Sequence, residues 1–389
     1  MEFEDVKWVA HGFGPTKISL YTGGPKISHE RCNHYILAAR PSILLPFTMP
    51  PSTMLAWQYQ TTKGGFLANL NLNTVPLPDP KPTQHLVQVL HAALNPVDYK
   101  LAEVAFVSRF AIPRPATPGI DFVGRMVAPA AGSNLKPGQM VFGFANPSPL
   151  AAGSLREYAV VETTGVVAAP EGVEARALAA SGVGASTAYQ SIVPYVKPGD
   201  HVLINGGSGG VGVYSIQVAK AAGCRVTTTC STPNVELCRS LGADHVIDYR
   251  TQDVLETLKK RGQQFDHVVD NVGSQWDLVW RSHEYTKPGA SIAYLGVAPT
   301  FDFAWNLLKV LAWPSALGGA RRKFANLSVV PVNSELEQLG AWMKDGKIKP
   351  VFDSVWPMEK VPEAFRKLKT GRAKGKVVID VASDSKSPE

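Results

Sequence analysis

The segment from His201 to Cys230 contains three successive hydrophobic patterns. A continuous apolar run comes first, apolar residues at helical spacing follow, and a second strand-like run ends the segment. The run His201–Asn205 is short and apolar, which is typical of a strand buried on both faces. Apolar residues then recur with helical spacing, at Val213, Ile216, Val218 and Ala219. A second, β-branched run ends at Cys230. This pattern predicts a strand, a helix and a second, parallel strand.

The motif Gly207-x-Gly209-x-x-Gly212 lies between the first strand and the helix. We expect the first glycine to permit a tight turn, the second to let the backbone approach a pyrophosphate, and the third to let the helix pack against the strand. The helix N-terminus adds free N–H groups and a positive dipole end. The sequence therefore predicts a dinucleotide-binding loop formed by Gly207, Ser208, Gly209, Gly210, Val211 and Gly212.

The end of the second strand indicates which dinucleotide is bound. An NAD-binding unit usually has Asp or Glu there, to hold the ribose 2′-hydroxyl. This chain instead has Ser231 and Thr232, whose hydroxyls could donate to a 2′-phosphate, and Tyr249 with Arg250 lies further on. The same hydroxyls could equally cap the next helix. We expect NADPH rather than NADH.

Strands and helices alternate through the rest of this region, which predicts a doubly wound parallel sheet over residues 175–330. The expected helices are Glu174–Val183, Ser186–Val193, Val235–Leu241 and Asp253–Arg261. The expected strands are His245–Asp248, His267–Asn271 and Ile292–Leu295.

The first half of the chain has a different pattern, with short β-type segments separated by Gly and Pro. It predicts a mostly antiparallel, barrel-like domain over residues 51–174. Its expected strands are Met54–Tyr59, Leu70–Val75, His85–Leu94, Phe122–Val127, Met140–Phe144 and Tyr158–Val161, with a loop at Pro113–Gly119. Residues 331–382, with a helix at Leu336–Lys344 and a strand at Lys376–Val381, are expected to rejoin this domain.

The composition predicts a globular protein that does not bind nucleic acid. The chain has 389 residues, 45% hydrophobic and 18% charged, so we expect a globular protein with a sizeable core. The net charge of +7 is spread along the chain, and no basic run has interleaved aromatics, which argues against nucleic-acid binding. The four cysteines form no C-x-x-C pair, so we expect them to be reduced in an intracellular compartment.

The N-terminal segment, residues 1–50, differs from the rest and is expected to be a poorly ordered extension. It opens with Glu2, Glu4 and Asp5, which argues for the cytoplasm over a mitochondrial presequence without excluding mitochondria. Its apolar run Ile36–Phe47 is broken by Arg40 and two prolines, so no membrane span is expected.

Several short segments occur in a distinctive order along the chain. They are Ala93–Lys100 (ALNPVDYK), Pro118–Gly124 (PGIDFVG), Gly153–Tyr158 (GSLREY), the glycine loop, Asp270–Gly273 (DNVG) and Gly371–Lys376 (GRAKGK). Together they resemble the medium-chain dehydrogenase/reductase superfamily, in its zinc-free quinone oxidoreductase and enoyl reductase branch. The resemblance implies an α/β protein with a GroES-like β-barrel domain and a doubly wound parallel-sheet (Rossmann) nucleotide-binding domain.

No metal site is expected, for a chemical reason. A catalytic zinc needs three protein ligands. Zinc-dependent relatives supply Cys and His where this chain has Asn95-Pro96-Val97-Asp98 and Gly119-Ile120-Asp121. Hydride transfer to a quinone or to a C=C bond conjugated to a carbonyl does not need a Lewis acid, because hydrogen bonds can stabilise the developing charge on oxygen.

The resemblance also implies a role for individual residues. The glycine loop would hold the pyrophosphate, and Ser231, Thr232 and Tyr249 would surround the 2′-phosphate. The nicotinamide end would be formed by Asn95, Asp98, Asn271, Leu295, Val297 and Lys376. Asp121 would rather bond turn amides.

The proton donor is left open by the sequence. Some relatives use a Tyr in the loop after the Asn-Pro-x-Asp segment, but the corresponding stretch, Leu101–Arg109, has none. Tyr99 and Lys100 are the nearby candidates, Lys100 being equally a solvated strand-end charge, and water is an equal contender.

The expected protein is an NADPH-dependent reductase of a small hydrophobic quinone or enone. The alternatives are a trans-acting enoyl reductase for a carrier-bound polyketide and a non-catalytic NADPH-binding scaffold or trafficking protein. The resemblance suggests a homodimer. The apolar stretch Ala298–Ala320 would cap a hydrophobic pocket or touch a membrane surface, or equally be a packed helix or a dimer contact.

Overall fold

The computed structural model describes residues 50–145, 151–273, 275–295, 300–313 and 319–382. By its internal contacts the chain separates into Met1–Met49 and Pro50–Glu389, and all of the described residues belong to the second unit. The predicted extension, residues 1–50, lies almost wholly outside the described residues, as do Val297 and Cys32.

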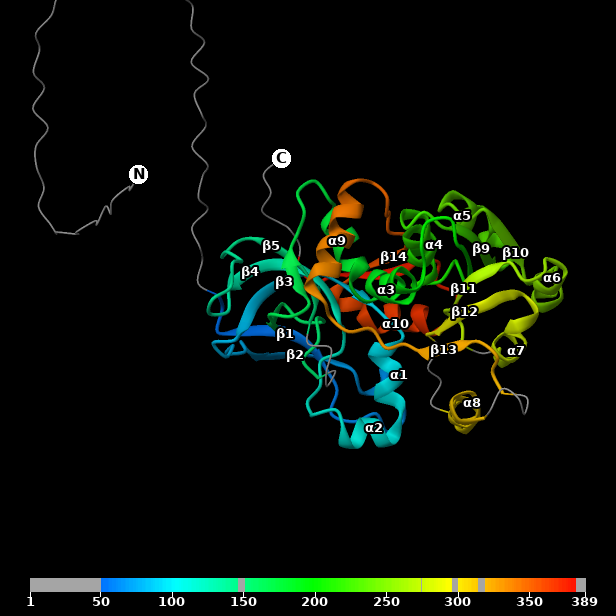
Figure 1. The fold of residues 1–389 in the computed structure, drawn as a ribbon. Helices are drawn as coiled ribbons and strands as arrows, with labels where there is room; N and C mark the ends of the chain where they lie inside the picture. Colours follow the sequence, from blue (N-terminus) through cyan, green and yellow to red (C-terminus); the bar gives the residue numbers. More distant parts are fainter. Residues whose placement is uncertain (1–49, 146–150, 274, 296–299, 314–318, 383–389) are drawn as a thin grey trace, which may run out of the picture. The chain divides into compact units, whose positions relative to one another are not determined.

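The first domain is built on β-sheet from the N-terminal part of this unit, completed by two strands from its C-terminal end (Figure 1). Strands β1 (Thr53–Gln58) and β2 (Asn71–Pro76) form an antiparallel pair. A seven-stranded sheet has the order β14-β15-β3-β4-β5-β7, and β6 also pairs with β3. Its strands are β3 (Gln84–Leu94), β4 (Asp121–Ala128), β5 (Met140–Phe144), β6 (Tyr158–Glu162), β7 (Val166–Ala168), β14 (Phe352–Pro357) and β15 (Lys376–Asp380).

The second sheet is six-stranded and wholly parallel, in the order β10-β9-β8-β11-β12-β13. Its strands are β8 (His201–Asn205), β9 (Arg225–Cys230), β10 (His245–Asp248), β11 (Phe265–Asp270), β12 (Thr286–Tyr294) and β13 (Lys323–Asn326). The order reverses between β8 and β11, which places a ligand crevice at their carboxyl ends. The predicted fold class is thus confirmed, an antiparallel β-rich domain joined to a doubly wound parallel sheet.

Helices cover the sheets and join them. The first six are α1 (Val97–Glu103), α2 (Ala105–Phe110), α3 (Ala175–Ile192), α4 (Gly212–Ala221), α5 (Val235–Ser240) and α6 (Val254–Lys260). The others are α7 (Trp276–Trp280), α8 (Phe301–Ala312), α9 (Asn333–Lys344) and α10 (Val361–Lys369). None of the helices in the described ranges is long and apolar enough to cross a bilayer.

One long helix stands where two were predicted. Helix α3 runs unbroken from Ala175 to Ile192 and contacts β3, β4 and β5 as well as α4. Two glycines of this helix allow close packing. A Cβ at Gly182 would lie 2.5 Å from Asp121 Oδ1, and one at Gly184 would lie 3.0 Å from the Gly210 carbonyl oxygen. Glycine inside this helix therefore brings the two domains together.

The segment after the Asn-Pro-x-Asp motif is also corrected. It was predicted to be a loop, but α1 and α2 occupy most of it, and Lys100 lies in α1 rather than at a strand end. The N–H of Asp98 donates to the Asn95 carbonyl, and that of Lys100 to the Pro96 carbonyl. Pro96 suits the start of a helix, because its fixed φ is helical and it has no N–H to leave unpaired.

Candidate functional site

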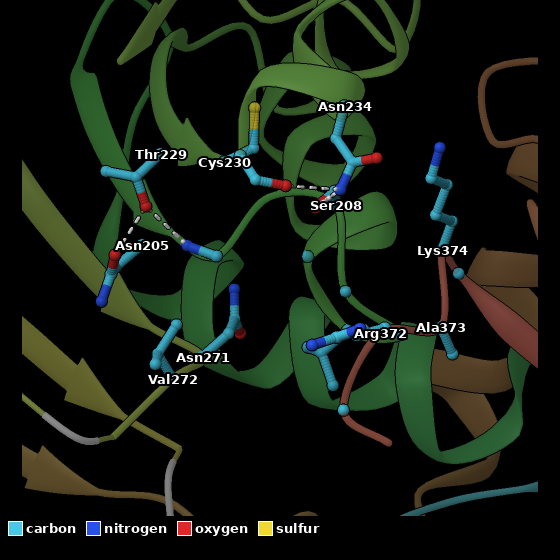
Figure 2. Close-up of a pocket in the computed structure, with 18 of the residues that line it drawn as sticks. Asn205, Ser208, Thr229, Cys230, Asn234, Asn271, Val272, Arg372, Ala373 and Lys374 are labelled. Carbon is cyan, nitrogen blue, oxygen red and sulfur yellow. Dashed lines mark hydrogen bonds between the residues drawn. The ribbon is translucent and has the colours of Figure 1, made fainter. Parts of the chain in front are cut away.

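A cavity of about 1320 Å³ lies where the parallel sheet ends. The glycine loop and the ends of β9 and β11 line one part of it, Asn95 with Pro96 another, and the C-terminal return Gly371–Lys376 a third. Figure 2 shows Asn271 and Val272 across the cavity from Ser208 and Asn234, with Arg372 entering from the C-terminal return. The cavity is therefore at the crevice that the strand order predicts.

The glycine loop combines one strained turn with two close approaches. Its turn is made by Gly206, with φ of +83°, and not by Gly207 as predicted. A Cβ at Gly207 would lie 2.1 Å from Thr228 Oγ1, and one at Gly212 would lie 2.1 Å from the Gly206 carbonyl oxygen. Gly209 lines the cavity and has only one heavy atom within 4 Å of its would-be Cβ, at 3.6 Å. The Gly209 N–H donates to the Gly206 carbonyl over 3.3 Å, so it is the space above this glycine, rather than its N–H, that is open to a ligand.

Side chains at three strand ends hold this loop in place. Thr229 donates to Asn205 Oδ1 over 2.6 Å, and its hydroxyl oxygen accepts the Gly206 N–H over 2.9 Å. The Asn205 amide donates in turn to Asp270 Oδ1 over 2.8 Å. Asp270 also accepts the N–H of Val272 and Gly273, and burial raises its pKa. The turn into the loop is thus tied to β8, β9 and β11.

Asn271, directly after β11, has a side chain without a partner. Both its amide nitrogen and its amide oxygen are buried and make no hydrogen bond. Asn271 lines the cavity. A buried amide left unpaired is costly, so this one indicates a ligand with both a donor and an acceptor. A sugar hydroxyl is a group that offers both.

The end of β9 carries polar groups, as predicted. Ser231, Thr232 and Tyr249 line the cavity, and so does Arg250. The Thr232 hydroxyl and the Arg250 N–H bond Asp248 and lower its pKa, so the nearest carboxylate is already engaged. The Thr232 hydroxyl is engaged with it. Ser231, Tyr249 and Arg250 are therefore the polar side chains in this part of the cavity that remain for a ligand.

The cavity lining is cationic. Arg250, Arg372, Lys374 and Lys376 line it, and no Asp or Glu is among the described residues that do. Sequence reasoning missed Arg372 and Lys374, although both lie within the segment GRAKGK. The missed signal was two cations in a glycine-bounded turn, with φ of +65° at Gly371 and +79° at Gly375. This lining suits a ligand that carries phosphates.

A buried network joins the C-terminal return to the first domain. Lys376 Nζ donates to Asn95 Oδ1 over 2.5 Å and to Asp121 Oδ2 over 2.9 Å. The Asn95 amide donates to Asp121 Oδ2 over 2.9 Å, and the Val183 N–H of α3 donates to Asp121 Oδ1 over 2.6 Å. All three side chains are buried. Asp121 was expected to bond turn amides, but it bonds a helix amide and Lys376 instead.

Asp98 lies behind this network and does not itself line the cavity. Its Oδ2 accepts the Asn95 N–H over 2.7 Å, while its Oδ1 is buried without a partner. Burial raises the pKa of Asp98 to about 8, and the Asp121 carboxylate adds to the rise. Asp98 is therefore protonated at neutral pH.

The predicted proton donors lie elsewhere. The Tyr99 ring packs edge-on against Phe365, and Lys369 Nζ stands 4.9 Å above it. Neither Tyr99 nor Lys100 lines the cavity. Leu295 does not line it either, because it packs into the core of the nucleotide domain. Of the predicted glycines, Gly207 lies behind the loop surface.

The described residues contain no group of three or more His, Cys, Asp or Glu that could hold a metal ion. A nicotinamide dinucleotide fits the residues present, because they offer an open glycine loop, the unpaired Asn271 amide and a cationic lining. Fold and site together define a two-domain oxidoreductase that binds a nicotinamide dinucleotide.

Comparison with known proteins agrees with this class. Residues 81–171 match the alcohol dehydrogenase GroES-like domain, and residues 241–379 match the family described as zinc-binding dehydrogenase. A trans-enoyl reductase of Aspergillus terreus is 47% identical over 352 residues, 85% of this chain and 97% of that protein. An NADPH-dependent alkenal/one oxidoreductase of Arabidopsis thaliana is 33% identical, over 85% of this chain and 80% of that protein.

A solved quinone oxidoreductase of Coxiella burnetii superposes with a TM-score of 0.72 at 27% identity, over 85% of this chain and all of that one. The chain belongs to the medium-chain dehydrogenase/reductase superfamily, in its quinone oxidoreductase-like branch. It is an oxidoreductase.

Proposed function

We propose that the protein uses NADPH to reduce a C=C bond conjugated to a carbonyl, or a quinone, in a small hydrophobic substrate. The observation that carries the proposal is the unpaired, buried Asn271 amide inside a cavity lined by four cations and, among the described residues, by no carboxylate. The reductases named among the relatives act on alkenal, enone-type or quinone substrates, which supports the same class of acceptor.

The chain's own residues supply binding and orientation. The dinucleotide supplies the hydride when bound. The loop from Ser208 to Gly212, at the start of α4, would hold the pyrophosphate, and Arg372 and Lys374 add positive charge to the lining of the cavity. Ser231, Tyr249 and Arg250 favour a 2′-phosphate over a bare ribose hydroxyl. Water is the proton source we propose, because neither Tyr99 nor Lys100 reaches this cavity.

The direct test follows oxidation of the reduced nicotinamide by absorbance, with NADPH or NADH and a panel of enones and quinones. We expect turnover with NADPH at a kcat/KM at least ~10-fold above that with NADH. Gly209→Val should abolish turnover and nucleotide binding, because the new side chain occupies the surface that the pyrophosphate approaches. The control is Gly340→Ala in helix α9, outside the cavity lining, where the would-be Cβ comes no closer than 3.4 Å to its neighbours. It should keep both activities.

Two other results would change the assignment. Failure to bind either nucleotide, in a protein that unfolds cooperatively, would refute the proposal. Tight NADPH binding without turnover of any acceptor would favour a non-catalytic scaffold.

A second candidate substrate is an enoyl thioester on a carrier protein, reduced in trans. It is favoured by the 47% identity to a trans-enoyl reductase, 97% of which this chain covers. The same assay separates the two, with one enoyl group presented as a free enone, as a small thioester and on a carrier protein. A kcat/KM that is high only for the carrier-bound form would support the second candidate.

A further inference from the structure

Two cysteine thiols touch each other behind one wall of the cavity. Cys230 is the last residue of β9, and Cys238 lies in α5, which packs on β9. Both side chains are buried in the same apolar cluster. The Cys238 thiol donates a hydrogen bond to the Cys230 sulfur. Cys224, the third cysteine of the described residues, donates to the Lys197 carbonyl instead.

The hydrogen bond makes the two sulfurs chemically unequal. It favours a thiolate at Cys230 and lowers the pKa of that thiol, an effect that burial and Asp248 oppose and that the Arg239 charge supports. The same bond raises the pKa of Cys238, which therefore keeps its proton. The thiolate, and not the thiol, is the nucleophile in cysteine oxidation. Cys230 is thus the sulfur that attacks an oxidant, and Cys238 is the neighbouring thiol that can complete a disulfide.

The chain between the two thiols carries groups that face the cavity. Cys230 and the turn from Ser231 to Asn234 line it. The Asn234 amide donates to Ser208 Oγ over 3.0 Å and to Ser231 Oγ over 3.3 Å, which ties this turn to the glycine loop. Figure 2 shows Cys230 and Asn234 on the same side of the cavity as Ser208. A change in the spacing of Cys230 and Cys238 is therefore transmitted to the surface on which a dinucleotide would lie.

We propose that Cys230 and Cys238 are a redox pair, which a small hydroperoxide converts to a disulfide, and that this disulfide weakens dinucleotide binding. A covalent S–S bond is about 2 Å long, shorter than the contact between two hydrogen-bonded sulfurs. Helix α5 and the turn before it must therefore shift toward β9 when the bond forms. The redox pair is independent of the proposed function, whereas its effect on the dinucleotide rests on that function.

The oxidation takes place in two steps. The Cys230 thiolate attacks one oxygen of the hydroperoxide, the O–O bond breaks, and a sulfenic acid forms while the leaving oxygen takes up the proton that Cys230 had released. Cys238 then has no thiolate beside it to hold its proton. Its sulfur attacks the Cys230 sulfur, the S–S bond forms, and the sulfenic oxygen leaves as water with the Cys238 proton. Two thiols and one hydroperoxide thus give one disulfide, one alcohol or water, and one further water.

Burial restricts which oxidant can reach the pair. Cys230 is 1% exposed, so a bulky disulfide such as oxidised glutathione has no room against its sulfur. Hydrogen peroxide is little larger than water, and its approach is from the cavity that Cys230 lines. A dinucleotide bound in the cavity would cover this approach. The pair is therefore oxidised while the nucleotide site is empty.

The test is mass spectrometry of the nucleotide-free full chain after hydrogen peroxide and then N-ethylmaleimide, which blocks any remaining thiol. No Lys or Arg lies between Arg225 and Arg239, so trypsin releases both cysteines in one peptide, Val226–Arg239. We expect this peptide to lose the mass of two hydrogen atoms, to take up no maleimide, and to regain both thiols in dithiothreitol. Oxidised glutathione should leave it unchanged. NADPH at ~10 times its Kd should slow the oxidation about 10-fold.

Alanine variants assign the roles of the two sulfurs. In Cys238→Ala the Cys230 sulfenic acid should accumulate and be trapped by dimedone, and in Cys230→Ala the peptide should stay reduced. Cys224→Ala is the matched control, at a buried cysteine whose sulfur bonds a carbonyl, and it should form the disulfide as the wild type does. The oxidised wild type should bind NADPH with a Kd at least ~10-fold above that of the reduced protein, the cost of one hydrogen bond to a charged group.

The two readouts separate the possible failures. A peptide that stays reduced, that carries a sulfinic or sulfonic acid, or that is linked to another cysteine would overturn the redox pair. A disulfide that leaves the Kd for NADPH unchanged would overturn its effect on the nucleotide site. Reduced protein that binds neither nucleotide would instead refute the proposed function, and the mass of the peptide would still decide whether the redox pair exists.

Discussion

At the scale of single residues, the site contains a carboxyl group, that of Asp98, which is buried and has no cation bonded to it among the described residues. Asp98 is close enough to Asp121 and Lys376 for their charges to affect its pKa. One oxygen accepts a backbone N–H and the other is unpartnered. Its raised pKa, about 8, means that the folded protein holds a proton which the unfolded chain releases near pH 3.8. While it is protonated, Asp98 adds no negative charge beside the buried Asp121–Lys376 ion pair.

Because the folded protein holds this proton, its stability should decrease as pH rises. Between pH 4 and 8 the folded state binds more protons at Asp98, so the free energy of unfolding falls as pH rises through this window. Asp98→Asn keeps the acceptor for the Asn95 N–H and removes the ionisation. We expect the variant to be more stable than the wild type by about 5 kcal/mol at pH 8 and to differ little near pH 4. Urea unfolding at several pH values measures this.

The control for that series is Asp79→Asn, at an exposed position, which should leave the pH dependence unchanged. A variant as pH-dependent as the wild type, or one less stable than it at pH 8, would show that Asp98 is ionised in the folded protein.

At the scale of secondary-structure elements, a glycine inside a helix can have two different meanings. Gly182 in α3 lies against Asp121, where a Cβ would come within 2.5 Å of a carboxylate oxygen. Gly340 in α9 would meet only side-chain carbons, the nearest at 3.4 Å, which is an ordinary contact. Helix propensity alone favours alanine at both positions by up to ~1 kcal/mol. Only tertiary packing distinguishes them.

We therefore expect the same substitution to have opposite effects at the two positions. Gly340→Ala should raise the free energy of unfolding by ~0.5–1 kcal/mol, because it removes backbone freedom from the unfolded chain. Gly182→Ala should lower it by at least ~2 kcal/mol and weaken nucleotide binding, because it displaces Asp121 and hence Lys376. Thermal unfolding and nucleotide titration of both variants test this. Similar effects at both positions would mean that α3 is not closely packed on β4.

The sequence alone predicted the local elements of the fold, but not the contacts between residues far apart in the chain. Periodicity predicted β8, α4, β9 and the glycine loop, because those signals are local. It divided α3 between Val183 and Ser186, where the helix in fact continues and Gly184 packs against the Gly210 carbonyl oxygen, about 25 residues further along the chain. It also assigned no role to Arg372 and Lys374, since only the pairing of β15 with β3 brings the C-terminal return to the cavity. Local patterns contain no information about such contacts.

At the scale of the whole molecule, the C-terminal return holds the two domains together. Strand β15 lies inside the seven-stranded sheet, between β14 and β3, although it is the last strand of the chain. The Gly375 N–H, just before it, donates to the Ser208 carbonyl of the glycine loop over 3.2 Å. Lys376, the next residue, bonds Asn95 and Asp121 of the first domain. Two consecutive residues thus contact both the nucleotide loop and the β-rich domain.

The strength of this junction can be measured with a double-mutant cycle on Lys376 and Asp121. Lys376→Met leaves Asp121 buried without its cation, and Asp121→Asn leaves Lys376 buried without its carboxylate. Each single variant should lose about 3–5 kcal/mol of unfolding free energy, because an uncompensated buried charge costs more than the pair contributes. The double variant removes both charges, so its loss should be smaller than the sum by more than ~1 kcal/mol. Additive losses would mean that the two side chains stabilise the junction independently, and that Asp121 acts through Val183 rather than through Lys376.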